Sequence, residues 1–160
     1  MTENAHLIKQ LEHISNLLLS EETLRSSLQK VAWLAVRALE SCDGAGVSVD
    51  DGSEVVTMAS SDARVLVVDE LQYGSHEGPC LQAIQDGRIH RIDSMATEKR
   101  WPRFVELAAK TGVTGCLALP LFQDGTAFGS LNLYSYQDAG FSAARFGSSR
   151  TASRSSATAP

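Results

Sequence analysis

The sequence has no apolar run long enough to cross a membrane, since a spanning helix needs about 20 consecutive apolar residues. Its first ten residues, MTENAHLIKQ, lack the basic and apolar segments of a secretory signal peptide. Basic residues are not in excess either, because 14 Lys and Arg stand against 19 Asp and Glu and give a net charge of -5. Broad contact with a nucleic-acid backbone needs clustered cations. We therefore expect a cytoplasmic protein that neither enters a membrane nor binds nucleic acid directly.

Cysteine is scarce as well. The three cysteines, Cys42, Cys80 and Cys116, are widely spaced and include no CxxC pair and no Cys/His cluster. This spacing disfavours a metal site of the zinc type and fits reduced thiols. The 160 residues, 43% hydrophobic and 21% charged, are typical of one globular domain that buries a full core.

Residues 1–20 are predicted to contain an amphipathic helix, over about residues 4–19. Four apolar side chains recur there every three or four positions: Leu7, Leu11, Ile14 and Leu18. This stripe suits either packing against its own domain or pairing with a second copy. The four side chains are therefore candidates for a homodimer interface.

The following residues predict alternating helices and strands. A helix starts after Ser20 and runs to about Ser41, and the strands GAGVSV and EVVTMAS flank the turn DDGS. Residues 62–73 fit neither period and are expected to form a short helix or a loop over the core. Further along, we expect a helix between Pro79 and Gly87, a strand at RIHRID, a helix at WPRFVELAAKTG, and a hairpin of GCLALPLF and TAFGSLNLYS. The order predicts an α+β fold in which one antiparallel sheet packs on helices.

Residues 141–160 differ in composition from the rest, with three arginines, no acid and no apolar period. Such a segment cannot offset the entropy of its ordering by burying apolar surface. We expect this tail to be disordered beyond about Phe146.

Several short motifs occur in a characteristic order along the chain: Gln72-Tyr73, Glu77-Gly78-Pro79-Cys80, Arg100-Trp101-Pro102 with Phe104, Pro120-Leu121, and Gly129-Ser130-Leu131-Asn132-Leu133-Tyr134. As an ordered set over residues 20–136 they resemble the GAF domains of actinobacteria, especially those that precede an ANTAR RNA-binding domain. The resemblance implies a GAF/PAS-like antiparallel sheet of five to six strands flanked by helices, over residues 21–140.

The resemblance also implies a function and a departure from the family. It implies a small-molecule- or redox-responsive sensor and dimerisation module of a signalling or transcription-antitermination regulator. Family members have a further helix after the last strand, which residues 141–160 do not supply here. A truncated or out-of-frame end is our hypothesis for this tail, and a truncated remnant that binds no ligand is therefore an alternative to the sensor.

Cys80 is the most reactive candidate, because a thiol in the first turn of a helix feels the positive end of the helix dipole, which lowers its pKa. It is either a small buried residue or a redox sensor. His76 and Glu77 precede it, but the sequence does not show the oriented base and oxyanion site that nucleophilic catalysis needs. We therefore expect no enzyme. The alternative is a thiol enzyme resembling the GAF-fold free methionine sulfoxide reductases, whose cysteine arrangement does not map onto the three cysteines here.

The resemblance gives five candidates for the wall of a ligand pocket: Tyr73, Glu77, Cys80, Trp101 and Phe104. The aromatic ones are equally suited to filling the core. Bilin is disfavoured because no His follows the cysteine, and the residues typical of cyclic-nucleotide-binding GAF domains are not evident.

Two further groups of residues have less specific readings. Haem would need His76 or His90 as an axial ligand, and we expect His90 to be a strand residue turned to solvent. The cofactor is therefore unknown. Five basic residues gather near the third strand, and we interpret them as a solvated face first and an anion or partner surface second: Arg88, Arg91, Lys99, Arg100 and Arg103.

Overall fold

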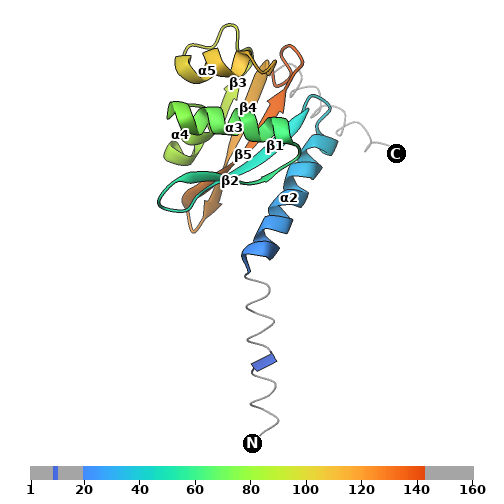
Figure 1. Cartoon of the computed structure of the whole chain (residues 1–160), viewed down its shortest axis with the longest axis vertical. Helices are drawn as coiled ribbons and strands as arrows, with labels where there is room; N and C mark the ends of the chain where they lie inside the picture. The colour runs from blue at the N-terminus through green and yellow to red at the C-terminus, as the bar shows by residue number, and fades with distance from the viewer. Residues whose placement is uncertain (1–8, 11–19, 143–160) are drawn as a thin grey trace, which may run out of the picture.

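The computed structural model describes residues 9–10 and 20–142, and five strands in this range form one antiparallel sheet (Figure 1). The strands are β1 (Gly44–Asp50), β2 (Val55–Ser60), β3 (His90–Ile92), β4 (Gly115–Gln123) and β5 (Thr126–Ser135). Their order across the sheet is β2-β1-β5-β4-β3. The β4–β5 turn places Asp124 and Gly125 at φ of 50° and 79°, as the Asp-Gly pair predicts. The predicted α+β architecture is confirmed.

Four helices surround the sheet. Helix α2 (Glu21–Ala38) contacts β1 and β2 on one face. Helices α3 (Ala63–Ser75) and α4 (Pro79–Asp86) cover the other face, and α5 (Pro102–Ala109) packs against α3. Figure 1 shows these three helices grouped together, with α2 apart from them. None of the described helices is both long and apolar enough to span a bilayer.

The helix boundaries follow from local capping chemistry. Residues 62–73, predicted as a short helix or a loop, belong to α3, because the Asp62 side chain accepts hydrogen bonds from Arg64 N and Val65 N. Helix α4 begins at Pro79 and ends before Gly87, which has a φ of 65°, as predicted.

Three elements are shorter than predicted. Helix α2 ends at Ala38, strand β3 spans only three residues, and α5 ends at Ala109. β3 lies at one edge of the sheet, and its register with β4 covers only His90 to Ile92. The chain leaves α5 through a turn in which Thr111 N donates to Ala108 O.

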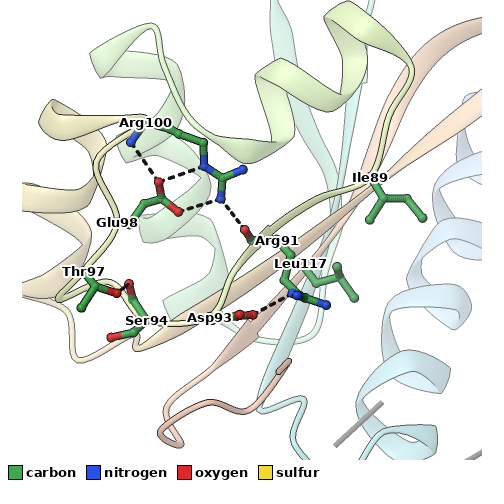
Figure 2. A pocket seen from close by; sticks show the side chains of 8 residues that line it. All are labelled: Ile89, Arg91, Asp93, Ser94, Thr97, Glu98, Arg100 and Leu117. Carbon is green, nitrogen blue, oxygen red and sulfur yellow. Dashed lines mark hydrogen bonds and ion pairs between the residues drawn. The ribbon is translucent and has the colours of Figure 1, made fainter. Parts of the chain in front are cut away.

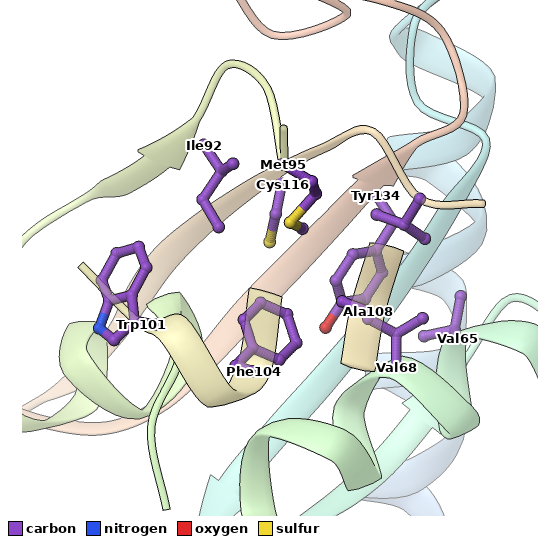
Figure 3. Close-up of a cluster of buried hydrophobic side chains, with 10 residues drawn as sticks. Val65, Val68, Ile92, Met95, Trp101, Phe104, Ala108, Cys116 and Tyr134 are labelled. Carbon is purple, nitrogen blue, oxygen red and sulfur yellow. The ribbon is translucent and has the colours of Figure 1, made fainter. Parts of the chain in front are cut away.

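The strands alternate their side chains between two cores. The core under α3 and α5 contains Ile92, Trp101, Phe104, Cys116 and Tyr134, among others (Figure 3). On the same face, Cys80 and Ala83 of α4 pack with Ala118 in a smaller cluster. The core under α2 contains Ala32, Ala45, Leu117, Leu133 and Phe141. Phe141 lies in a turn and is fully buried.

Two sequence predictions fall outside the described residues. Of the predicted N-terminal helix, only Lys9 and Gln10 are described, and both are helical. The dimerisation candidates Leu7, Leu11, Ile14 and Leu18, and the tail from residue 143 onwards, are not described.

Candidate functional site

A group of six polar side chains, four buried and two half-buried, lies between α3 and the sheet. It consists of Ser48 on β1, Thr57 on β2, Asp69 and Tyr73 on α3, and Asn132 and Tyr134 on β5, and is called the Asp69 cluster below. Strand register brings these residues together, since Ser48, Asn132 and Tyr134 point toward α3 from alternating positions of neighbouring strands.

Two glycines of β1 let α3 approach the sheet closely. A Cβ on Gly44 would lie 2.7 Å from Val65 Cγ2, and one on Gly46 would lie 2.6 Å from Asp69 Oδ2. Real Cβ atoms do not approach other atoms this closely, so any larger residue at either position would force Val65 or Asp69 to shift. The GAG sequence of β1 therefore places the Asp69 carboxylate directly on the sheet.

Asp69 is a carboxylate with no exposed surface. Thr57 Oγ1 donates to its Oδ2 at 2.9 Å, while Asn132 Nδ2, at 3.1 Å, and the Tyr134 hydroxyl donate to its Oδ1. Burial raises the Asp69 pKa to about 6, although these three hydrogen bonds oppose the rise. Among the described residues no basic side chain forms an ion pair with Asp69.

The hydroxyl groups of the Asp69 cluster form a chain of hydrogen bonds in which every donor points the same way along the chain. Asn132 Nδ2 donates to Ser48 Oγ at 2.8 Å, and Thr57 donates its only hydroxyl proton to Asp69. The Tyr73 hydroxyl, 2.8 Å from Thr57 Oγ1, must then donate to Thr57 and accept from Ser48. Every donor in the chain is therefore directed toward the Asp69 carboxylate.

Gln72 connects this cluster to α4. Its Nε2 donates to the Tyr134 hydroxyl at 2.8 Å, and its Oε1 accepts from Cys80 N, in the first turn of α4, at 2.9 Å. Gly78 makes room for this contact, because a Cβ there would lie 2.3 Å from Gln72 Oε1. Gln72 and Gly78 thus act together to position the start of α4.

Glu77 has a capping role on a different helix. Its Oε1 accepts hydrogen bonds from Arg103 N and Phe104 N, in the first turn of α5. Trp101, the residue at the α5 N-cap, makes no side-chain capping bond of its own. Glu77 therefore holds α5 against the loop between α3 and α4, and its side chain is directed at that helix and not into the Asp69 cluster.

The aromatic candidates separate into two environments. Tyr73 is half-buried and belongs to the Asp69 cluster. Trp101 and Phe104 are buried in the core beside Ile92 and Cys116 (Figure 3). The Trp101 ring also contacts the His90 ring edge-on and carries the Arg100 guanidinium over its face.

Cys80 lies next to the Asp69 cluster, with its Sγ 4.0 Å from Ser48 Oγ. It is fully buried, and both burial and the negative charge of Asp69 raise its pKa well above the ordinary value. The helix dipole therefore does not produce the lowered pKa that the sequence suggested. Burial also raises the pKa of Cys42, to about 11, and that of Cys116, and all three thiols are free.

The two candidate haem ligands lie apart from the Asp69 cluster. His76 is an exposed residue with a φ of 55° at the end of α3. We predicted that His90 points to solvent, but the His90 side chain is only 16% exposed, and its Nε2 contacts Asp86 Oδ2 at 2.8 Å. In residues 9–10 and 20–142 no group of three His, Cys, Asp or Glu side chains is arranged to hold a metal ion.

Two of the basic residues near β3, Arg91 and Arg100, line an open hollow of about 590 Å³ together with the acids Asp93 and Glu98 (Figure 2). Ion pairs join Arg91 to Asp93 at 2.7 Å, Arg100 to Glu98 at 2.7 Å, and Arg103 to Glu77 at 3.6 Å. Arg100 also donates to the carbonyl oxygen of Arg91 on the edge strand. Because carboxylates offset the three guanidinium charges, this surface matches a solvated face better than an anion site.

Among the residues predicted from the sequence, Tyr73 belongs to the Asp69 cluster and Cys80 lies beside it, but Asp69 itself was not predicted. Asp69 is an acid within the apolar segment VLVVDELQY, which is a recognisable signal for a buried functional group. Ser48 and Asn132 alternate with apolar neighbours along their strands, and this alternation resembles that of ordinary strands with one face in water.

Comparison with known proteins agrees with this architecture. The family model for the GAF domain matches residues 21–147. Type II free methionine-R-sulfoxide reductase from Thermoplasma acidophilum superposes with a TM-score of 0.62 at 17% identity, over 80% of this chain and 85% of that one. The GAF domain region of a protein from Geobacter sulfurreducens PCA gives 0.64 at 17% identity, over 88% and 91%.

A third structure is equally distant in sequence. The GAF domain of an Acinetobacter phosphoenolpyruvate-protein phosphotransferase gives a TM-score of 0.56 at 16% identity, over 90% of this chain and 87% of that one. No curated protein matches the chain. At these identities the structural matches establish the fold alone, whereas the family model covers most of the sequence. The chain therefore belongs to the GAF domain family.

Proposed function

We propose that this chain is the sensor module of a cytoplasmic signalling regulator and that a small ligand binds at the Asp69 cluster, behind Tyr73. One observation carries the proposal: a fully buried carboxylate lies among hydroxyl and amide groups, and two members of the group, Thr57 and Tyr73, are only half-buried and face the solvent side. A buried carboxylate with no paired cation costs free energy even when it is hydrogen-bonded, so a core with no binding role favours an apolar residue at position 69.

Native mass spectrometry of the protein purified from its own host tests this proposal. The expected result is a fraction of wild-type protein with added mass that disappears on denaturation. Asp69→Asn should lose the added mass, whereas Asp51→Asn, on the exposed turn between β1 and β2, should retain it. A wild-type protein with no added mass, even after incubation with a metabolite extract, would reject the proposal.

A small molecule is favoured over oxidation as the signal. The three thiols are buried and burial raises the pKa of each, so the reactive thiolate is scarce at neutral pH. The same observation weighs against the alternative, a thiol-dependent reductase. A turnover assay with methionine sulfoxide and a thiol reductant tests that alternative directly, and we expect no activity.

The proposal includes a homodimer formed through the N-terminal helix, by Leu7, Leu11, Ile14 and Leu18. Support comes from α2, which leaves Leu24, Val31 and Leu34 exposed. Leu24 and Val31 are seven residues apart and Leu34 follows three later, the spacing of a helix-pairing seam.

Light scattering tests the dimer. Wild type should be a dimer at micromolar concentration, and Leu34→Glu should shift it toward monomer. Leu66→Glu, an equally apolar exposed site on α3, is the matched control and should leave the dimer intact. A monodisperse wild-type monomer would reject the interface.

The sequence motifs also suggest which process this module regulates. We propose a regulator of transcription antitermination, which acts with an RNA-binding partner, on the motif resemblance to GAF domains that precede ANTAR domains. Pull-down with ANTAR-domain proteins of the host, with and without a metabolite extract, tests this assignment. Capture of a histidine kinase in place of an ANTAR protein would assign the module to a different pathway.

A further inference from the structure

The two oxygens of Asp69 differ in how completely they are bound. Oδ1 accepts from two donors, Asn132 Nδ2 and the Tyr134 hydroxyl. Oδ2 accepts from Thr57 Oγ1. A carboxylate oxygen has room for two donors, so Oδ2 can accept one more. The vacant acceptor position belongs to the oxygen on the β2 side of the cluster.

Tyr73 is the half-buried aromatic side chain of the cluster, and its hydroxyl lies one hydrogen bond away from the Thr57 hydroxyl that binds this oxygen. It lies four residues after Asp69 on α3, and therefore on the same helix face. Its hydroxyl is held between Ser48 Oγ and Thr57 Oγ1, and Thr57 in turn contacts Oδ2. If the Tyr73 side chain rotated outward, Thr57 Oγ1 would lose the hydrogen bond from the Tyr73 hydroxyl. A ligand could then donate a hydrogen bond to Thr57 Oγ1, next to Asp69.

The charge balance selects among the ligands that could take this place. An anionic group would lie beside a buried carboxylate with no basic side chain paired to it in the described structure. A neutral acceptor would also fit poorly, because Asn132, Thr57 and Tyr134 already donate to Asp69. A group with several N–H donors and a positive charge matches both the free acceptor on Oδ2 and the unpaired charge.

We infer that the ligand of the Asp69 cluster is a small organic cation, whose ammonium or guanidinium group replaces the Tyr73 hydroxyl and pairs with Asp69. This inference rests on the proposed function, which places a ligand at the cluster without stating its charge. Ser48 loses its acceptor when Tyr73 moves, and its hydroxyl can then turn to Cys80 Sγ, 4.0 Å away, or donate to the ligand.

The test uses the full chain with Tyr73→Ala, which opens a space of about the size of a phenol ring. The probes are benzylamine hydrochloride, benzyl alcohol and benzoate, which share a ring and differ in charge, titrated at pH 7.5 and followed by amide chemical shifts. We expect benzylammonium to bind about tenfold or more tightly than benzyl alcohol, and benzoate to bind least. The double variant Tyr73→Ala with Asp69→Asn should lose the preference for the cation.

Equal or tighter binding of the alcohol or of benzoate would overturn the inference, as would a cation preference that survives in the Asp69→Asn background, or no binding of any probe. Should Tyr73→Ala fail to fold, Tyr73→Leu removes the hydroxyl but keeps apolar contact. It would be titrated with methylammonium, methanol and formate, with the same order expected.

Failure of the proposed function gives a different result. Wild-type protein from its host would then show no bound ligand by native mass spectrometry, whatever the variants prefer. A bound ligand that proves to be neutral or anionic would leave the proposed function standing and overturn the inference.

Discussion

The ionisation of Asp69 should make the folded protein less stable as the pH rises from about 4 to about 7. The folded-state pKa is about 6, against an ordinary value of 3.8, because burial disfavours the charged form. Between these two values the folded chain binds more protons at this site than the unfolded chain does. By linkage, the free energy of unfolding therefore falls with rising pH.

The size of the effect follows from the same two pKa values. Their difference corresponds to about 3 kcal/mol of unfolding free energy. The folded protein has this extra stability below pH 3.8, where Asp69 is protonated, and has lost all of it above about pH 7. Asn cannot ionise and nearly matches the shape of Asp. The stability of wild type relative to Asp69→Asn should therefore decline by about 3 kcal/mol across this interval.

Urea denaturation of both proteins at half-unit steps from pH 4 to pH 7.5 measures this difference, in which the other titrating groups cancel. Asp51→Asn is the control. Its hydrogen bonds to residues 53 and 54 lower the Asp51 pKa to about 2, so its contribution is lost only below pH 3.8. A wild-type curve parallel to that of Asp69→Asn between pH 4 and 7 would refute the reasoning.

Three further predictions concern the residues around the cluster. Glu77→Ala should lower the unfolding free energy by about 1–2 kcal/mol, because two N–H groups of α5 lose their acceptor, and Glu77→Gln should lower it less. Equal denaturation midpoints for wild type and Glu77→Ala would contradict the capping role. Gly78→Ala should lower the unfolding free energy more than Gly125→Ala does, because both glycines have positive φ but only Gly78 contacts Gln72. Chemical denaturation of the two variants measures this difference. Equal losses of unfolding free energy would show that the contact with Gln72 has no effect. Iodoacetamide at pH 7.5 should label Cys80 far more slowly in the folded protein than in urea, whereas equal rates would restore Cys80 as a sensor thiol.

The fold was predictable because its turn and cap signals are local. A hairpin turn is indicated by Asp124-Gly125, the two ends of α4 by Pro79 and Gly87, and the start of α5 by Pro102. Helix α3 was ambiguous because its buried face includes the polar Asp69 and Gln72, which interrupt the apolar period.

The candidate site was only partly predictable, because its contacts join residues far apart in the sequence. Glu77 bonds to α5 across 26 residues, and Asn132 bonds to Ser48 across 84. Local sequence indicates that Glu77 and Cys80 matter but not what they touch. In the structure Gln72, Glu77 and Gly78 position two helices, and this leaves Asp69 and its hydroxyl neighbours as the chemistry available to a ligand.

Chemical-shift mapping shows directly whether a ligand binds at the Asp69 cluster. Isotope-labelled wild-type protein would be titrated with a metabolite extract of the host. We expect amide shifts concentrated on β1, β5 and α3, around Ser48, Asp69, Tyr73 and Asn132, and we expect these shifts to be absent in Asp69→Asn. Shifts confined to the hollow beside β3, or no shifts at all, would contradict this expectation.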